Sequence, residues 1–177
     1  MLRLAEVLSP CGEVARFNFP YREKGAARPD PMPVLKQCIE EKAARLRVDR
    51  NQARLIIGGR SMGGRAASML AAEGFACDGL MLFAYPLHPA GKPDRLRDAH
   101  LAQIGVPVLC FNGTRDALCT RELMETAVGK LPNWTMYWLE GADHSFRVLK
   151  SSGRTDAEVY AEVAQATQRW LGGMRLA

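Results

Sequence analysis

The chain has 177 residues, 47% of them hydrophobic, which is enough for one domain with a continuous core and too short for two typical domains, so residues 1–177 are expected to form a single unit. The chain has 24 basic residues and a net charge of +5. The basic residues are scattered, without a block of five or six together, and this pattern favours a solvated basic surface over a nucleic-acid-binding surface. The five cysteines are an odd number without a Cys-x-x-Cys spacing, which argues against zinc and redox motifs and favours buried thiols in a reducing compartment.

The first residues contain no apolar stretch long enough for a signal peptide, because Arg3 and Glu6 interrupt residues 1–11. Elsewhere no segment reaches the length of a transmembrane helix. The sequence therefore predicts a cytoplasmic protein without a membrane or nucleic-acid partner.

Short apolar or aromatic runs alternate with segments of helical periodicity along the chain. The runs predicted to be strands are 14–19, 55–58, 80–85, 106–112 and 135–139. The segments predicted to be helices are 2–8, 34–46, 62–73, 96–104, 121–131 and 156–171. Strict alternation of this kind favours an α/β fold, a doubly wound and mostly parallel sheet of about five strands with helices on both faces.

The last predicted helix has clear signals at both ends. Thr155 is followed three residues later by Glu158, which is the capping-box spacing for a helix start. Gly172 and Gly173 are expected to end the helix.

The segment between the second predicted strand and the helix after it contains Gly59, Ser61 and Gly63, which fit the pattern Gly-x-Ser-x-Gly. On a strand-to-helix turn this pattern holds the serine in a strained conformation with its hydroxyl exposed. Side chains at Gly59 or Gly63 are expected to collide with the turn. The N–H of Met62 would lie at the positive end of the following helix, where it can stabilise a developing oxyanion.

Glycine-rich turns of this kind also bind phosphates, so two other functions need to be considered. A Walker loop would need Lys and Ser or Thr where the chain has Arg65 and Ala66, and a dinucleotide-binding loop would need Gly at Ser61. Nucleotide binding is therefore a remote alternative.

A serine nucleophile needs a base, and the chain offers three histidines. His144 lies in a polar loop after the last predicted strand, at the sheet edge where reacting groups gather, and is the predicted base. His100 falls inside a predicted helix, which favours a surface or packing role. His88 follows the third predicted strand and is a candidate for lining the site.

The acid of the predicted site is Asp116, in the loop after the fourth predicted strand. This choice gives the chain order Ser, Asp, His. Asp143 is the competing candidate, but a neighbour of the histidine usually points elsewhere, and it is expected to cap its own loop.

Three short segments, 59–63, 113–116 and 141–144, resemble the catalytic stations of the α/β-hydrolase superfamily. Residues 16–21, Arg-Phe-Asn-Phe-Pro-Tyr, resemble a small bacterial branch akin to dienelactone hydrolase and to a hydrolase-like subunit of a histone-acetyltransferase complex. The resemblance implies an esterase without a cofactor or metal. It implies Ser61 as nucleophile, Asp116 and His144 as its partners, and the Met62 N–H as an oxyanion donor.

The resemblance also implies features that this sequence lacks. Family members begin with a central strand and a small-residue oxyanion loop, whereas this chain opens on what resembles the following helix. Three explanations remain open: the sequence starts at an internal methionine, the strand at 14–19 moves beside the nucleophile strand, or a partner chain, such as a second copy, covers the gap.

The segment after the third predicted strand is too short for a substantial lid, which favours small soluble esters as substrates. Arg60 and Arg115 adjoin predicted catalytic residues and either attract an acidic acyl group or have surface salt-bridge or elbow-packing roles. The alternative to a serine hydrolase is a non-catalytic interaction module on the same scaffold.

Overall fold

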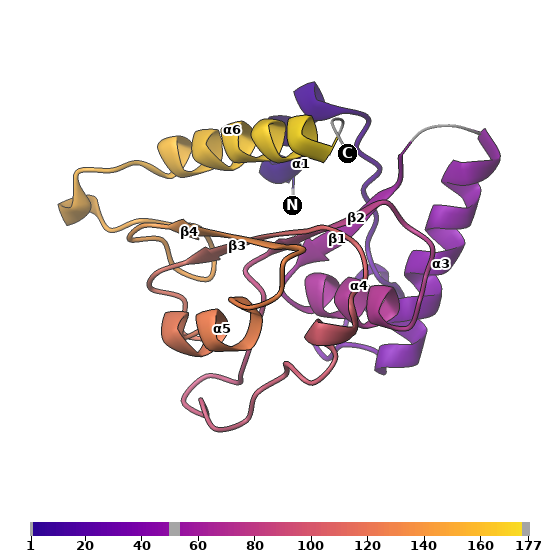
Figure 1. Ribbon diagram of the computed structural model, residues 1–177, viewed down its shortest axis with the longest axis horizontal. Coiled ribbons are helices and arrows are strands. Elements are labelled where there is room, and N and C mark those ends of the chain that lie inside the picture. Colours follow the sequence, from indigo (N-terminus) through magenta and orange to yellow (C-terminus); the bar gives the residue numbers. More distant parts are fainter. Residues whose placement is uncertain (1, 50–53, 175–177) are drawn as a thin grey trace.

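A four-stranded parallel sheet forms the centre of the computed structural model, which describes residues 2–49 and 54–174 (Figure 1). The strands lie in the order β1-β2-β3-β4 and comprise Ile56–Arg60 (β1), Gly79–Phe83 (β2), Val108–Gly113 (β3) and Trp134–Leu139 (β4). Since each strand pairs with the next one in the chain, right-handed crossovers place all three connections on the same face.

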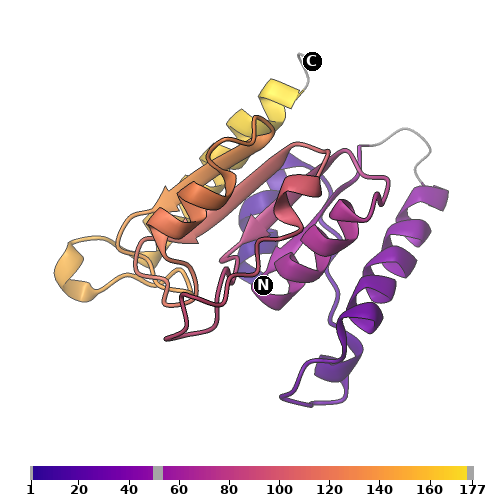
Figure 2. The same ribbon diagram turned by 60° about the horizontal axis from the view of Figure 1, so that its bottom comes forward.

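Helices cover both faces of this sheet (Figures 1 and 2). On one face lie α3 (Met32–Asp49), α4 (Met62–Ala72), α5 (Arg121–Val128) and the 3₁₀ turn η2 (Leu101–Gln103). On the other face lie α1 (Leu2–Leu8) and α6 (Asp156–Met174). The remaining short elements are η1 (Ser9–Cys11), α2 (Pro20–Glu23) and η3 (Lys150–Ser152). The predicted α/β class with helices on both faces is confirmed.

Alternation of side chains along the central strands divides the core into two layers. Leu80 and Leu82 of β2 pack against α3 and α4, whereas Met81 and Phe83 pack against α1 and α6. All five residues of β2 are buried, as expected for a strand with helices on both sides. The two apolar layers fix the register of the sheet, because a one-residue slip would exchange them.

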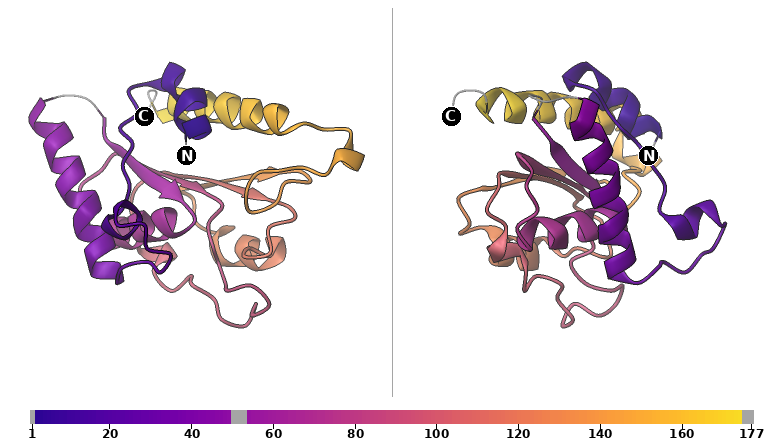
Figure 3. Two further views of the ribbon diagram at one scale, coloured as in Figure 1. Left: turned by 180° about the vertical axis from the view of Figure 1, so that it is seen from behind. Right: turned by 90° about the vertical axis from the view of Figure 1, so that its right-hand side faces the viewer.

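The strand predicted at residues 14–19 is wrong. This segment is extended, but it joins no ladder, and residues 12–18 are exposed. Figure 3 shows it descending from the layer of α1 and α6 to the layer of α3 and α4. β-branched and aromatic residues gave the segment a strand-like composition, but a strand exists only where another strand satisfies its backbone groups.

β1 is an edge strand, and its outer edge is unpaired within the described ranges 2–49 and 54–174. The Leu55 carbonyl accepts from the Asp78 N–H, and the Ser61 N–H donates to the Phe83 carbonyl. These groups of Leu55 and Ser61 therefore point towards β2. Alternation along the strand therefore turns the backbone groups of Ile56, Gly58 and Arg60 outward. Segment 14–19 does not pair with β1, so the explanation in which it covers this edge is wrong.

The helix predicted at 96–104 and the predicted end of the last helix also differ from the structure. The helix expected at 96–104 is reduced to η2, because residues 96–100 form a loop. α6 passes through Gly172 and Gly173 and ends at Met174. Its predicted start is confirmed: Thr155 Oγ1 accepts from the Glu158 N–H at 3.3 Å, and the Thr155 N–H donates to Glu158 Oε2 at 2.7 Å.

In the described part of the chain, none of the helices combines the length and the apolar character that crossing a membrane requires.

Candidate active site

Ser61 occupies the sharp turn between β1 and α4 and has a left-handed backbone, with φ 51° and ψ −116°. A positive φ costs a residue other than glycine about 1–3 kcal/mol, so the surroundings must hold it. The Ser61 N–H donates to the Phe83 carbonyl at 2.8 Å, and the Ser61 carbonyl accepts from the Arg65 N–H at 3.0 Å. The turn is thus anchored on one side to β2 and on the other to the first turn of α4.

Close backbone contacts explain two of the glycines around Ser61. A Cβ at Gly59 would lie 2.7 Å from the carbonyl carbon of Gly63, and one at Gly64 would lie 2.7 Å from the carbonyl oxygen of Gly59. A Cβ at Gly63 would meet only Phe19 Cε2, at 3.6 Å, which is ordinary contact. The expected collision at Gly63 is therefore wrong, and Gly64 is the second position where the close approach requires glycine.

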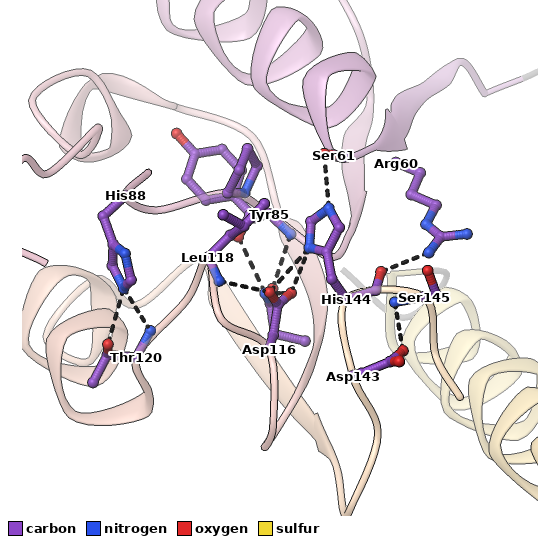
Figure 4. Close-up of polar contacts among 12 residues, drawn as sticks. Arg60, Ser61, Tyr85, His88, Asp116, Leu118, Thr120, Asp143, His144 and Ser145 are labelled. Atoms are coloured by element: carbon purple, nitrogen blue, oxygen red, sulfur yellow. Dashed lines mark hydrogen bonds and ion pairs between the residues drawn. The ribbon is translucent and has the colours of Figure 1, made fainter. Parts of the chain in front are cut away.

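The structure brings Ser61, Asp116 and His144 together at the carboxyl ends of the strands (Figure 4). His144 Nε2 lies 2.9 Å from Ser61 Oγ, and His144 Nδ1 lies 2.8 Å from Asp116 Oδ2 and 3.0 Å from Oδ1. The carboxylate only accepts, so Nδ1 carries the hydrogen and the Nε2 lone pair faces the hydroxyl. In this tautomer the imidazole can take the serine proton while the carboxylate stabilises the resulting positive charge.

The Asp116 side chain is fully buried, whereas 29% of the His144 side chain is exposed. Apart from His144, the carboxylate accepts from the Leu118 N–H at 2.8 Å and from Asn112 Nδ2 at 3.4 Å. A buried carboxylate needs such donors to offset the loss of water. The turn after β3 therefore fixes the acid, while the base keeps an accessible side.

Asn112 is the polar residue of this site that sequence reasoning missed. It is fully buried in β3, where its Oδ1 accepts from the Tyr85 N–H at 3.1 Å and its Nδ2 donates to the Tyr85 carbonyl at 3.1 Å. It links the end of β2 to Asp116. The sequence did contain a signal for this role, because Asn112 is an amide side chain at the end of an otherwise apolar strand. A buried amide needs polar partners for its hydrogen bonds.

Two arginines hold the loop that carries His144. Arg60 Nη2 donates to the His144 carbonyl at 2.5 Å, and its guanidinium lies 5.6 Å from the centre of the Phe146 ring. Arg115 Nη1 donates to the Gly141 carbonyl at 3.0 Å. Both contacts give these arginines a structural role, as donors to backbone carbonyls of this loop.

Asp143 points away from the imidazole (Figure 4). Its Oδ1 accepts from the Ser145 N–H at 2.7 Å and from the Arg147 N–H at 3.0 Å. It caps its own loop, as the sequence suggested.

The other two histidines lie outside this group. His88 is buried, and its Nδ1 donates to the Pro89 carbonyl at 3.0 Å while its Nε2 accepts from the Thr120 N–H at 3.1 Å. It ties the loop after β2 to the start of α5 and does not contact the three side chains (Figure 4). His100 lies in the loop before η2 and contacts Ser68 of α4, with Nε2 2.8 Å from Oγ.

Met62 is the first residue of α4, directly after Ser61. Backbone N–H groups in the first turn of a helix have no intrahelical acceptor, and the helix dipole places partial positive charge there. The structure therefore puts Met62 where the sequence expected an anion-stabilising N–H.

Known proteins with the same fold include annotated hydrolases. The chain is similar to an alpha-beta serine hydrolase homologue from Coxiella burnetii, with 20% identity and a TM-score of 0.71 over 95% of this chain and 74% of that one. An α/β serine hydrolase without a lid from Xanthomonas campestris has 21% identity and a TM-score of 0.72 over 96% and 72%. A dienelactone hydrolase from Anabaena variabilis has 22% identity and a TM-score of 0.68 over 96% and 76%. At these identities, the TM-scores establish a shared fold and nothing more. The family described as Alpha/beta hydrolase domain matches residues 1–172, and the chain therefore belongs to that family.

Proposed function

We propose that this protein is a serine hydrolase that cleaves a small carboxylic ester through an acyl-enzyme. Ser61 is the nucleophile, His144 the general base and acid, and Asp116 the residue that orients the imidazole. The observation that carries the proposal is the continuous hydrogen-bonded path from Ser61 Oγ through both ring nitrogens of His144 to Asp116. Membership of the α/β hydrolase family supports hydrolysis as the reaction class.

In the first half-reaction, Ser61 Oγ attacks the ester carbonyl carbon while His144 Nε2 accepts the hydroxyl proton. The carbonyl oxygen becomes an oxyanion near the Met62 N–H. When the tetrahedral intermediate collapses, the bond to the alkoxy oxygen breaks and the alcohol leaves with the proton from His144 Nε2. Ser61 is then esterified by the acyl group.

In the second half-reaction, a water molecule attacks the acyl carbon and gives a proton to His144 Nε2. Collapse of the second intermediate breaks the bond to Ser61 Oγ, which recovers its proton from the imidazole. The carboxylic acid is released. The Met62 N–H is the donor assigned to this oxyanion.

Small soluble esters suit this site because the irregular segment 84–100 after β2 offers little that could cover it. Tyr85 and Leu87 of this segment are fully buried. Its first part, residues 84–88, therefore belongs to the core, and its exposed part, residues 90–96, is too short for a substantial lid over Ser61. An open site of this kind buries little of a long acyl chain.

The test is hydrolysis of p-nitrophenyl acetate, which should give a burst of p-nitrophenol followed by slow turnover. Ser61→Ala and His144→Ala should both lose the burst, while Ser145→Ala serves as the matched control because that serine is exposed beside His144 and its side chain supports no other group. A fluorophosphonate should label the wild type and not Ser61→Ala. Absence of labelling in the folded wild type would refute the proposal.

The unpaired edge of β1 favours a second candidate function, a non-catalytic interaction module. Outward backbone groups of Ile56, Gly58 and Arg60 would pair with a strand of another chain, including a second copy of this protein. This function predicts self-association that increases with concentration in sedimentation experiments and is the same for Ser61→Ala. A monomer at all concentrations would argue against the second-copy form.

A further inference from the structure

A recess of about 370 Å³ lies beside α4, on the side that faces the loop before η2. The residues that line it are Arg65, Met69, Leu96, Arg97, Ala99, His100 and Gln103. None of the three side chains of the candidate active site lines it. We call it the cationic recess.

Positive charge dominates the cationic recess, because its lining includes two guanidiniums and no carboxylate. Burial, followed by the charge of Arg65, lowers the pKa of Arg97 and of His100 from their ordinary values. Asp98 and Glu73 act on His100 in the opposite direction, but neither lines the recess, and Glu73 is bonded to Lys36 at 2.5 Å. The cations thus face one another without an acid between them.

Arg65 is the least satisfied of these groups. Its Nε is buried and has no hydrogen-bond partner among the described residues. Buried donors in native proteins are almost always paired, and leaving one unpaired costs about 1–3 kcal/mol, more for a charged group. The Arg97 guanidinium makes a long hydrogen bond, from Nη1 to the Pro86 carbonyl at 3.4 Å. Both arginines line the recess, so an anion that enters it would meet two guanidiniums, neither of which is paired with a carboxylate in the described part of the chain.

His100 is held in place by α4. Ser68 Oγ donates to the Arg65 carbonyl at 2.9 Å and lies 2.8 Å from His100 Nε2. Since the hydroxyl has one hydrogen, His100 Nε2 is the donor in the second bond. The fixed ring leaves Nδ1 able to accept a proton when negative charge enters the recess.

We propose that the cationic recess binds the carboxylate or phosphate group of a small organic anion. The planar guanidiniums of Arg65 and Arg97 would contact its oxygens, since arginine is suited to both kinds of oxyanion. Met69 and Leu96 would pack against its apolar part. The volume falls in the usual range for small-ligand sites. The proposal does not depend on Ser61, so the ligand need not be a substrate.

Thermal unfolding at constant ionic strength tests this, with chloride replaced in one series by inorganic phosphate and in another by propionate. Binding to the folded state should raise Tm in proportion to the logarithm of the anion concentration in at least one series. Arg65→Gln and Arg97→Gln should each weaken binding by about tenfold or more. The series in which Tm rises shows whether the recess binds a phosphate or a carboxylate group.

Two controls separate the recess from other anion sites. Ser61→Ala should keep the full shift, and Arg28→Gln, which removes an exposed arginine outside the recess, should also keep it. A second readout is the NMR titration of His100, whose pKa should rise when the anion binds. No shift with either anion, or equal shifts in the wild type and both arginine variants, would overturn the proposal.

Discussion

Asn112 places its side-chain amide 3.4 Å from Oδ2 of Asp116, so a buried residue of β3 supports the carboxylate that holds His144. The same amide bonds to both backbone groups of Tyr85. One side chain thus connects the end of β2, the strand β3 and the turn after it. The position of the acid is therefore set by the sheet as well as by the loop.

Asn112→Ala should lower both stability and activity. It leaves the buried Tyr85 N–H without an acceptor, which should cost about 1–3 kcal/mol in the free energy of unfolding, measured by urea denaturation. The kcat for p-nitrophenyl acetate should fall more than KM changes, because a positioning residue acts through Asp116.

Asn112→Asp separates positioning from a purely structural role. It keeps an acceptor for the Tyr85 N–H and puts a second buried carboxyl group beside Asp116, where the two carboxyl groups would share a proton instead of both ionising. The acidic limb of the kcat/KM profile should then move to higher pH. An unmoved profile with normal folding would limit Asn112 to a structural role.

Asp116→Asn should reduce kcat by roughly 10⁴-fold with little change in fold, because an amide can present its N–H to His144 and favour the wrong tautomer. Asp143→Asn is the matched control, since the amide oxygen still accepts from the Ser145 and Arg147 N–H groups. Stopped-flow measurement of the acylation burst checks both. Equal activities of the two variants would contradict the assignment of the acid.

Gly59→Ala and Gly63→Ala should differ sharply although both belong to the same five-residue pattern. The new Cβ at 59 would lie 2.7 Å from the Gly63 carbonyl carbon, and overpacking of this kind costs about 1–3 kcal/mol. The Cβ at 63 has ordinary contact at 3.6 Å, so its effect should stay within about 0.5 kcal/mol. Urea denaturation measures the free energy of unfolding of both variants. Equal destabilisation would contradict the prediction and would show that the turn adjusts to the new Cβ at position 59.

His100 should make the protein less stable as pH falls. Burial and the Arg65 charge lower its pKa in the folded state below the ordinary value of 6.5, so the unfolded chain binds a proton first. The stability that neutral His100 contributes is complete above the unfolded pKa and is lost as pH falls towards the folded one. Between about pH 7.5 and about pH 5.5, His100→Gln should lose less unfolding free energy than the wild type. Parallel pH curves for the two proteins would contradict this.

Local signals predicted much of the fold and the meeting of Ser61, Asp116 and His144. The pattern around Ser61, the Thr155 capping box and the loops after strands are each encoded within a few residues, and parallel strands bring their carboxyl ends to one edge. These signals also place the three side chains at the same end of the sheet without any knowledge of distances.

Two of the misses originate in contacts between distant segments, and another in the exact path of a short turn. Segment 14–19 has the composition of a strand but lacks a neighbouring strand, which composition cannot reveal. Asn112 acts through Tyr85, 27 residues earlier in the chain. The collision expected at Gly63 belongs to Gly64, because which backbone atoms approach depends on the exact path of the turn.

The consecutive strand order has a consequence for biosynthesis. During translation, the strained turn at Ser61 can be anchored once residue 83 leaves the ribosome, because the Phe83 carbonyl accepts its N–H. The imidazole that faces the hydroxyl is made 61 residues after that point, as position 144 minus position 83 gives. A nascent chain thus carries its serine without a base while the next 83 residues are made, from position 61 to position 144, and reactivity would arise only when the last strand has docked.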